Sequence, residues 1–297
     1  KNSLTGLPIG GGKGGSDFDP KGKSDREVMA FCQSFMTELC KYIGADTDVP
    51  AGDIGTGARE IGYMFGQYKR IRGLYEGVLT GKGLTYGGSL ARTEATGYGV
   101  AMMAREALAK VGIDIKGAKV ALQGCGNVGS YAGMYIEEFG AKVVIVGDHT
   151  GTITNPDGID MKALMAYIPT TPNRGIKGFP GAEATDQNVL TADVDLLMPC
   201  ALENQLTAEN ANDVKAKVVC EGANGPTTPG ADEIFAQKGI TLVPDILANS
   251  GGVTVSYYEW VQNLQRDSWS FEEVQAKQEK AMKKAFVVDN DVYIWTS

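Results

Sequence analysis

Histidine is almost absent from this 297-residue chain, because His149 is the only one. A catalytic triad with a histidine base, or a metal centre built from several histidines, is therefore not expected, and no metal is predicted. Long apolar runs are absent too, since none reaches the roughly 20 residues that a membrane-spanning helix needs. The sequence predicts neither a metalloenzyme nor a membrane-spanning protein.

Positive charge is also in short supply. The chain has 28 lysines and arginines against 36 aspartates and glutamates, which gives a formal net charge of −8. Nucleic acid and anionic membrane surfaces bind concentrated positive charge, so neither partner is expected. The five cysteines form no CxxC pair, and Cys32 and Cys40 lie too far apart in a predicted helix to bridge. We expect reduced thiols in a cytoplasmic protein.

The chain length fits two domains of roughly 100–200 residues each. We predict a partial substrate and oligomerisation domain over residues 1–88 and a dinucleotide-binding domain over residues 89–297. Lys1 stands inside a motif at the very start of the sequence, so we expect an N-terminal segment to be missing.

Hydrophobic spacing predicts helices over 25–43, 59–71, 94–111 and 271–286, and strands over 119–123, 142–146, 194–198, 217–220 and 241–244. Capping boxes are predicted at Ser24 with Glu27 and at Ser270 with Glu273. The strand runs are short and rich in valine and leucine, as in strands buried on both faces. The predicted class is α/β, with two domains, the second being a Rossmann-like doubly wound parallel sheet.

A glycine-rich turn follows the predicted strand 119–123 directly. In a dinucleotide-binding turn the first glycine makes the bend, the second admits the pyrophosphate, and the third lets helix and strand pack closely. Asp148 follows the next strand, 19 residues after Gly129, where a carboxylate can bind ribose hydroxyls. We predict that NAD or NADP is bound by Gly124, Gly126, Asn127, Val128, Gly129 and Asp148. The alternative is a glycine turn with a structural role only.

Lys13 stands between glycines on both sides, in Gly10-Gly11-Gly12-Lys13-Gly14-Gly15. Such a loop permits close approach, and a partly dry ammonium there would be usable as a base near neutral pH. The alternative is a solvated lysine on a flexible loop. Asp53, in Pro50-Ala51-Gly52-Asp53, is either a turn aspartate or its partner in proton transfer.

Five segments together resemble the glutamate, leucine, phenylalanine and valine dehydrogenase family. They are residues 1–20 around Lys13, Asp48-Val-Pro-Ala-Gly-Asp53, Gly87-Gly-Ser-Leu-Ala-Arg-Thr-Glu-Ala-Thr-Gly-Tyr-Gly99, Glu221-Gly-Ala-Asn-Gly-Pro-Thr-Thr228 and Ala248-Asn-Ser-Gly-Gly-Val-Thr-Val-Ser256. The last four match the glutamate branch in order. Two features depart from the family: its lysine for the side-chain carboxylate lies upstream of Lys1, and its last helices are not found after about residue 286.

The resemblance implies a role for each matching residue. Lys13 would be the catalytic lysine and Asp53 its proton-transfer partner. Substrate would be bound by Lys1 at the α-carboxylate, by Gly52, and by Ser256 at the side-chain carboxylate. The nicotinamide amide and ribose would be held by Thr96, Asn224 and Asn249.

The implied activity is reversible oxidative deamination of L-glutamate to 2-oxoglutarate and ammonia, in a homo-hexamer. Two alternatives remain: a branched-chain or aromatic amino-acid dehydrogenase of the same family, and a catalytically inactive assembly subunit. The choice between NAD and NADP stays open. Asp148 would repel a 2′-phosphate, whereas His149 and Thr150 offer groups that bind one.

Overall fold

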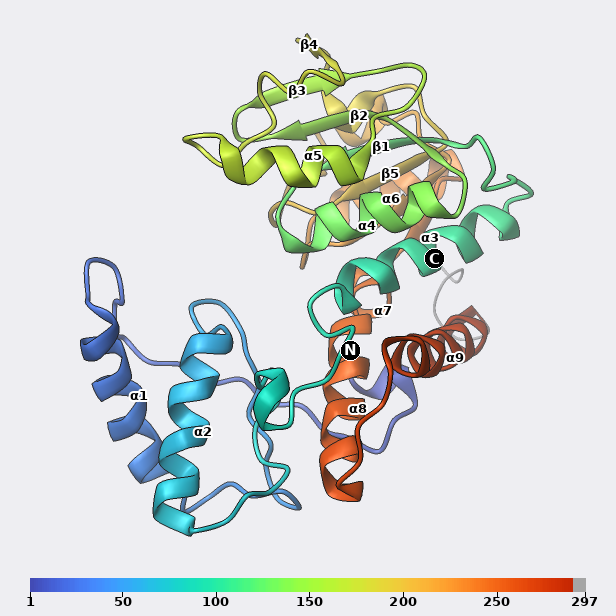
Figure 1. Ribbon diagram of the computed structural model, residues 1–297. Helices are drawn as coiled ribbons and strands as arrows, with labels where there is room; N and C mark the ends of the chain where they lie inside the picture. The colour runs from blue at the N-terminus through green and yellow to red at the C-terminus, as the bar shows by residue number, and fades with distance from the viewer. Residues whose placement is uncertain (291–297) are drawn as a thin grey trace. The chain divides into compact units, whose positions relative to one another are not determined.

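The structure is a computed structural model that describes residues 1–290, with side chains described as far as Val287 (Figure 1). Its chain divides into two compact units. The sheet unit contains Lys1–Gly6, Thr93–Gly252 and the chain from Gln278 onward, and the helical unit contains Leu7–Arg92 and Val253–Lys277. These two units are defined by how closely their residues pack. The boundary at residue 88 was predicted between a substrate domain and a dinucleotide-binding domain, and it stays a prediction.

The sheet unit holds one seven-stranded sheet in the order β4-β3-β2-β1-β5-β6-β7. Its strands are β1 (Lys119–Gln123), β2 (Lys142–Asp148), β3 (Gly151–Thr154), β4 (Glu183–Thr185), β5 (Leu196–Pro199), β6 (Val218–Cys220) and β7 (Thr241–Val243). The five predicted strands pair in parallel, whereas β3 and β4 pair antiparallel at one edge. The strand order reverses at β1, between β2 and β5, which is where a doubly wound sheet binds its ligand.

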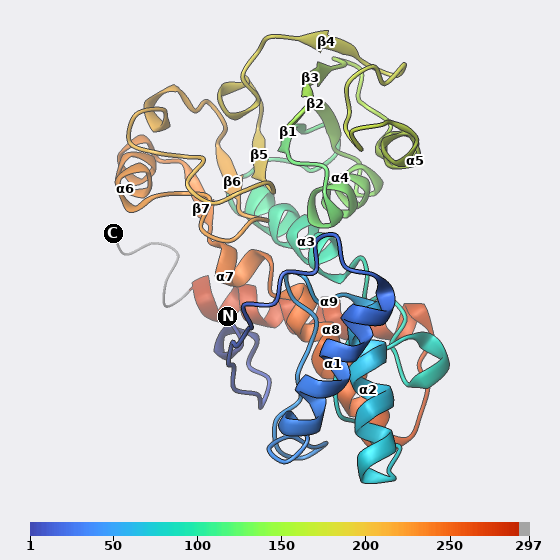
Figure 2. The ribbon, with the colours of Figure 1, turned by 90° about the vertical axis from the view of Figure 1, so that its left-hand side faces the viewer.

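Helices cover both faces of this sheet (Figures 1 and 2). They are α3 (Ala95–Lys110), α4 (Asn127–Glu138), α5 (Met161–Tyr167), α6 (Pro229–Lys238) and the short α7 (Asp245–Ala248). Helices α3, α4 and α5 pack on one face and α6 on the other. The doubly wound prediction for this part of the chain is confirmed.

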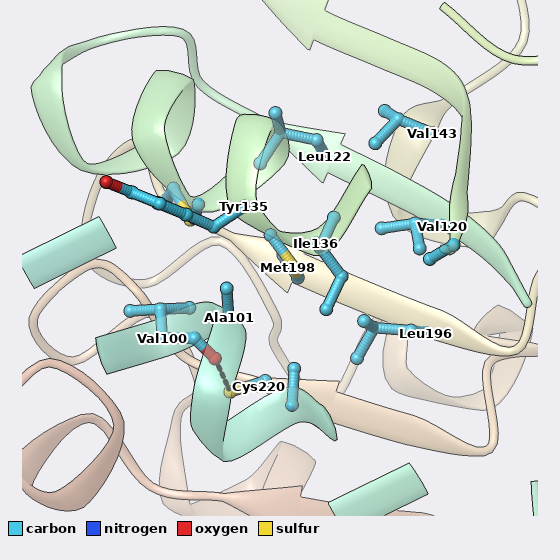
Figure 3. Close-up of a cluster of buried hydrophobic side chains, with 14 of the residues drawn as sticks. Val100, Ala101, Val120, Leu122, Tyr135, Ile136, Val143, Leu196, Met198 and Cys220 are labelled. Atoms are coloured by element: carbon cyan, nitrogen blue, oxygen red, sulfur yellow. Dashed lines mark hydrogen bonds between the residues drawn. The ribbon is translucent and has the colours of Figure 1, made fainter. Parts of the chain in front are cut away.

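Alternation along each strand explains why both faces are apolar. Val120 and Leu122 of β1 point into the cluster under α3 and α4 (Figure 3), while Ala121 between them joins the cluster under α6. In the first cluster the Cys220 thiol donates to the carbonyl oxygen of Val100, 3.5 Å away. Every central strand is therefore held by apolar contacts on both sides.

The helical unit begins with α1 (Asp25–Leu39) and α2 (Ala58–Arg72), which lie side by side (Figure 1). Two later helices cross into or out of this unit: α8 (Gly251–Gln265) and α9 (Phe271–Asn290). Both predicted capping boxes are present. Ser24 at the start of α1 exchanges hydrogen bonds with Glu27, and Ser270 before α9 does so with Glu273.

Some predicted boundaries were wrong. Helix α1 ends at Leu39, not at residue 43. Ile43 is buried, which suggested helical spacing, but it belongs to the segment that follows the helix. Helix α9 continues to Asn290, past the predicted end at 286, and the tail beyond it lies outside the described residues. No helix in the described part of the chain is long and apolar enough to cross a membrane.

Candidate functional site

The turn from β1 to α4 needs glycine at two positions for close packing. Gly124 has φ +92°, and a Cβ there would lie 2.8 Å from the Ala201 backbone. A Cβ at Gly129 would lie only 1.9 Å from the Gly124 carbonyl oxygen. The positive φ of Gly124 fits a tight turn, and the close approach at Gly129 needs a residue without a Cβ so that strand and helix can pack together.

Gly126 has a different environment. It is the N-cap residue of α4, with φ −73° and ψ −167°, and a Cβ there would meet no atom within 4 Å. No side chain caps this helix, so the backbone N–H groups of Asn127, Val128 and Gly129 face outward without a partner in the helix. Open space, unpaired N–H groups and the positive end of the helix dipole together suit a pyrophosphate.

Asp148 ends β2 with its side chain 6% exposed. One carboxylate oxygen accepts hydrogen bonds from the N–H and hydroxyl of Thr150 at 2.7 and 2.6 Å, and the other accepts from the Ile176 N–H at 3.0 Å. The carboxylate thus fixes the turn after β2 against the segment around residue 176. The carboxylate already accepts three hydrogen bonds from the protein, and its binding to the ribose hydroxyls stays a prediction.

Three predicted residues converge at the carboxyl end of β6. The Asn249 amide nitrogen donates to the carbonyl oxygens of Gly222 and Ala223 and, at 2.9 Å, to the side-chain oxygen of Asn224. The same Asn224 oxygen accepts from Lys1 Nζ at 3.2 Å. Asn249 Oδ1 is buried and accepts no hydrogen bond from the described residues, so it is available to an amide donor of a ligand.

Thr96 lies in the first turn of α3, beside α4. A Cβ at the neighbouring Gly97 would lie 2.7 Å from the Val128 carbonyl oxygen, and one at Gly251 would lie 2.3 Å from the Ala95 carbonyl oxygen. This close packing brings the start of α3 next to the start of α4 and to the segment after Asn249. The structure therefore brings predicted cofactor residues from four separate stretches of chain together in the sheet unit.

Lys13 and Asp53 meet in the helical unit, 40 residues apart in sequence. The Lys13 ammonium forms a short ion pair with the Asp53 carboxylate. The side chains are 83% and 51% exposed, so the expectation of a partly dry lysine was wrong for this chain. The physical reason is the loop composition, since a Cβ added at Gly10, Gly12, Gly14 or Gly15 would meet no atom within 4 Å.

Asp53 is held in a tight turn. Its N–H donates to the Thr56 carbonyl oxygen at 3.1 Å, and the Thr56 N–H donates back to the Asp53 carbonyl at 2.9 Å. Gly55 has φ +73° in this turn, and a Cβ at Gly52 would lie 2.9 Å from the Thr56 oxygen. Asp53 is therefore a turn residue and the partner of Lys13 at once, and the two readings are compatible.

The comparison with known families agrees with this arrangement. Residues 87–289 match the family described as Glutamate/Leucine/Phenylalanine/Valine dehydrogenase. Residues 1–70 match the Glu/Leu/Phe/Val dehydrogenase dimerisation domain.

The chain belongs to the Glu/Leu/Phe/Val dehydrogenase family.

Individual relatives lie in the glutamate branch of this family. The chain is 48% identical over 293 residues to the NAD-specific glutamate dehydrogenase of Clostridioides difficile, covering 96% of this chain and 69% of that protein. It is 45% identical to the NADP-specific glutamate dehydrogenase A1 of Halobacterium salinarum, covering 99% of this chain and 70% of that protein.

Solved structures of the family have the same fold. Plasmodium falciparum glutamate dehydrogenase 2 superposes with a TM-score of 0.90 at 43% identity, covering 96% of this chain and 65% of that one. A hetero-hexameric glutamate dehydrogenase from Thermus thermophilus, in a Leu-bound form, gives a TM-score of 0.88 at 31% identity, covering 97% and 68%. The chain thus spans about two thirds of the length of these family members.

Ser256, predicted to read a substrate carboxylate, lies on α8 of this family member with 9% exposure. One turn further on, Glu259 is fully buried with Lys82. Sequence reasoning missed this pair, although Glu259 stands three residues after Ser256 and therefore on the same helix face.

Glu221 is a second buried acid that the sequence analysis did not single out. It follows β6 directly, is 5% exposed, and accepts a hydrogen bond from the Asp245 N–H at 2.8 Å. Burial raises the pKa of its carboxyl to about 7. Its position in the family segment Glu221-Gly-Ala-Asn224 was the available signal.

Proposed function

We propose that this chain carries out the reversible NAD(P)-dependent oxidative deamination of L-glutamate to 2-oxoglutarate and ammonia. The observation that carries the proposal is the ion pair between Lys13 and Asp53, formed in the helical unit of a chain whose sheet unit has a dinucleotide turn. The names of the glutamate-branch relatives support the substrate. An inactive assembly subunit would have no need of this pair.

The residues of the sheet unit fit a nicotinamide dinucleotide. The N–H groups of Asn127, Val128 and Gly129 suit the pyrophosphate, and the space at Gly126 lets it approach. Thr96, Asn224 and Asn249 would hold the nicotinamide end, where the unpaired Asn249 Oδ1 can accept from the carboxamide. A nicotinamide held there would supply the acceptor for the hydride that leaves the glutamate Cα.

The other steps belong to the chain's own residues. Glutamate, oxidised cofactor and water give 2-oxoglutarate, ammonium, reduced cofactor and one proton. Lys13 and Asp53 together remove and return protons as water adds to the imino carbon and the carbon–nitrogen bond breaks. Because the pair already shares a hydrogen bond, a proton can pass between ammonium and carboxylate without rearrangement of the loop.

Substrate binding is proposed for three further residues. Lys1 would contact the α-carboxylate, and the Ser256 hydroxyl would contact the side-chain carboxylate. Gly52 would also line the substrate site. A single hydroxyl cannot neutralise a carboxylate, so a lysine upstream of Lys1 is proposed to assist. The predicted division into a partial substrate domain, residues 1–88, and a dinucleotide domain, residues 89–297, describes these two functions.

Either NAD or NADP is proposed as the cofactor, since relatives of both specificities match this chain about equally well. Asp148 points inward onto Thr150 and Ile176, so its charge is directed at protein donors. Steady-state rates of the complete protein with each cofactor measure the preference directly.

We further propose a homo-hexamer in the cytoplasm. The name of the hexameric relative supports an assembly, as does the matched dimerisation domain. Phe35 and Tyr42, 40% and 70% exposed near the carboxyl end of α1, are apolar surface that an interface would bury. All five cysteines are free thiols, which supports a reducing compartment. Light scattering of the purified protein tests the assembly.

The test of the function is a substrate comparison. The complete protein is incubated with NAD or NADP and glutamate, leucine, phenylalanine or valine, and formation of reduced cofactor is followed. Fastest turnover with glutamate supports the proposal. Faster turnover with leucine or valine would overturn the substrate while leaving the dehydrogenase chemistry, and no turnover with any of them would overturn the activity.

A further inference from the structure

A buried carboxylate, Glu259 of α8, joins this helix to the segment Gly81–Lys82 within the helical unit. Its side chain is 0% exposed, and that of its partner Lys82 is 1% exposed. One oxygen accepts from Lys82 Nζ at 3.0 Å and from the Lys82 N–H at 3.2 Å, and the other accepts from the Gly81 N–H at 3.0 Å. Glu259 therefore binds both the backbone and the side chain of one short segment.

This carboxylate also faces a second cation. Arg92 is half-buried, its Nε atom lacks a hydrogen-bond partner in the described residues, and its attraction to Glu259 opposes a lowering of its pKa by burial. Burial likewise lowers the pKa of Lys82, against the attraction of Glu259. One carboxylate thus forms an ion pair with Lys82 and also attracts Arg92, so its removal would leave the buried Lys82 ammonium without its counter-charge.

The segment that Glu259 binds is joined to the Asp53 turn. Ala51 and Thr80 form a parallel backbone bridge, and the Thr80 N–H donates to the Pro50 carbonyl oxygen at 2.9 Å. Asp53 follows Ala51 by two residues. A shift of residues 80–82 would therefore move the start of the turn that presents the Asp53 carboxylate to Lys13.

On the other side, Glu259 is part of the helix that carries Ser256. The two residues are three apart in α8 and share a face. Further along the same helix, the Asn263 amide donates to the Gly87 carbonyl oxygen at 2.7 Å. The loop packs closely on α8 at this point, because a Cβ at Gly87 would lie 3.3 Å from the Asn263 side-chain amide.

We propose that Glu259 is a positioning residue for the dehydrogenase reaction, which fixes the Ser256 helix relative to the Asp53 turn through its hydrogen bonds to Gly81 and Lys82. The inference rests on the proposed function. Its meaning is geometric: one buried carboxylate sets the spacing between the hydroxyl that reads the substrate side chain and the carboxylate that serves the reacting carbon. Such spacing matters because misplacement by about 1 Å costs up to about a hundredfold in rate.

The test is Glu259→Gln in the complete protein. The amide keeps the shape of the side chain, but its NH₂ group must face a donor where the carboxylate accepted, and the charge is lost. We expect the kcat/KM for glutamate to fall about tenfold to a hundredfold, with a raised KM and a narrower preference for glutamate over norleucine. Cofactor affinity should not change, because the predicted cofactor residues belong to the sheet unit.

A merely structural role would lower the amount of folded enzyme, and KM and substrate preference do not depend on that amount. Should Glu259→Gln not fold, the double variant Lys82→Met/Glu259→Gln removes the pair together and is expected to fold with the same raised KM. Glu76→Gln is the matched control, since Glu76 accepts a hydrogen bond from buried Tyr68 in the same unit, and its KM should be that of wild type.

The outcomes separate the two proposals. Wild-type protein that is inert with glutamate overturns the proposed function. Active wild-type protein whose folded Glu259 variants keep the wild-type KM and substrate preference overturns the positioning role alone. The positioning role would also be overturned if the control Glu76→Gln raised the KM for glutamate as much as Glu259→Gln does.

Discussion

The sheet unit and the helical unit differ in the kind of residue that each contributes to the proposed function. In the sheet unit the site is mainly backbone: Gly124 and Gly129 allow close packing, and the first N–H groups of α4 face outward. In the helical unit it is mainly charge, with Lys13 and Asp53 exposed on loops and Glu259 fully buried. Substitutions should therefore act on cofactor binding or folding in the first unit, and on turnover or substrate preference in the second.

The largest expected effect tests the charge-based site. Lys13→Ala should lower kcat by about 10²–10⁴-fold, the range for a general acid–base group. Because the Lys13 side chain is 83% exposed, the melting temperature and the cofactor affinity should be unchanged. Turnover assays and a fluorescence titration with reduced cofactor measure both. A variant that kept more than about a tenth of wild-type kcat would remove Lys13 from the mechanism.

Ser256→Val sharpens the comparison at the substrate side chain. Loss of a hydrogen bond to a carboxylate, at roughly 1.5–3 kcal/mol, should lower kcat/KM for glutamate by about tenfold to a few hundredfold. The gap between glutamate and norleucine should narrow. Ser256→Thr adds similar bulk but keeps the hydroxyl, so it should retain the preference. Equal losses in both variants would point to shape and not to the hydroxyl.

Two glycine substitutions divide the backbone-based site into its two parts. Gly126→Val meets no protein atom at its Cβ, so the protein should fold, while added atoms where the pyrophosphate approaches cost about 1–3 kcal/mol of cofactor binding, or about tenfold to a hundredfold in Kd. Gly129→Ala puts a Cβ 1.9 Å from the Gly124 carbonyl oxygen and should lower the melting temperature instead. Undiminished cofactor affinity in Gly126→Val would contradict the assignment of the turn.

The smallest effect concerns pH. Burial raises the pKa of Glu221 from 4.5 to about 7 in the folded state, so the folded protein holds this proton more tightly than the unfolded chain. Stability from this group is present at low pH and is lost as pH rises from about 4.5 to about 7. Glu221→Gln should remove that loss, so its melting temperature should fall less than that of wild type between pH 5 and pH 8. Parallel curves for the two proteins would show that Glu221 does not titrate in this range.

The sequence predicted the centre of the fold better than its edges. The run Val120–Leu122 is apolar at every position, as expected for a strand that is buried on both faces, and this pattern predicted β1. Strands β3 and β4 were missed because they are short and have few buried residues. Edge strands make few of the apolar contacts that give a strand its sequence pattern.

The same contrast applies to the site. Fixed spacing predicted Gly124, Gly126 and Gly129, since one turn needs all three. Lys82 and Glu259 are 177 residues apart, and a pair that forms only by folding leaves no spacing in the sequence. The direction of the Asp148 carboxylate, toward Thr150 and Ile176, likewise depends on a loop whose path no local pattern specifies.

Cys125, in the turn from β1 to α4, has a consequence for handling and inhibition of the protein. Only the thiolate form of cysteine attacks electrophiles and oxidants at an appreciable rate. Burial raises the pKa of Cys125, and that of Cys200 beneath the turn to about 12, so both remain protonated near neutral pH. The turn should therefore resist peroxide and alkylating reagents, and covalent inhibitors aimed at these sulfurs should react slowly.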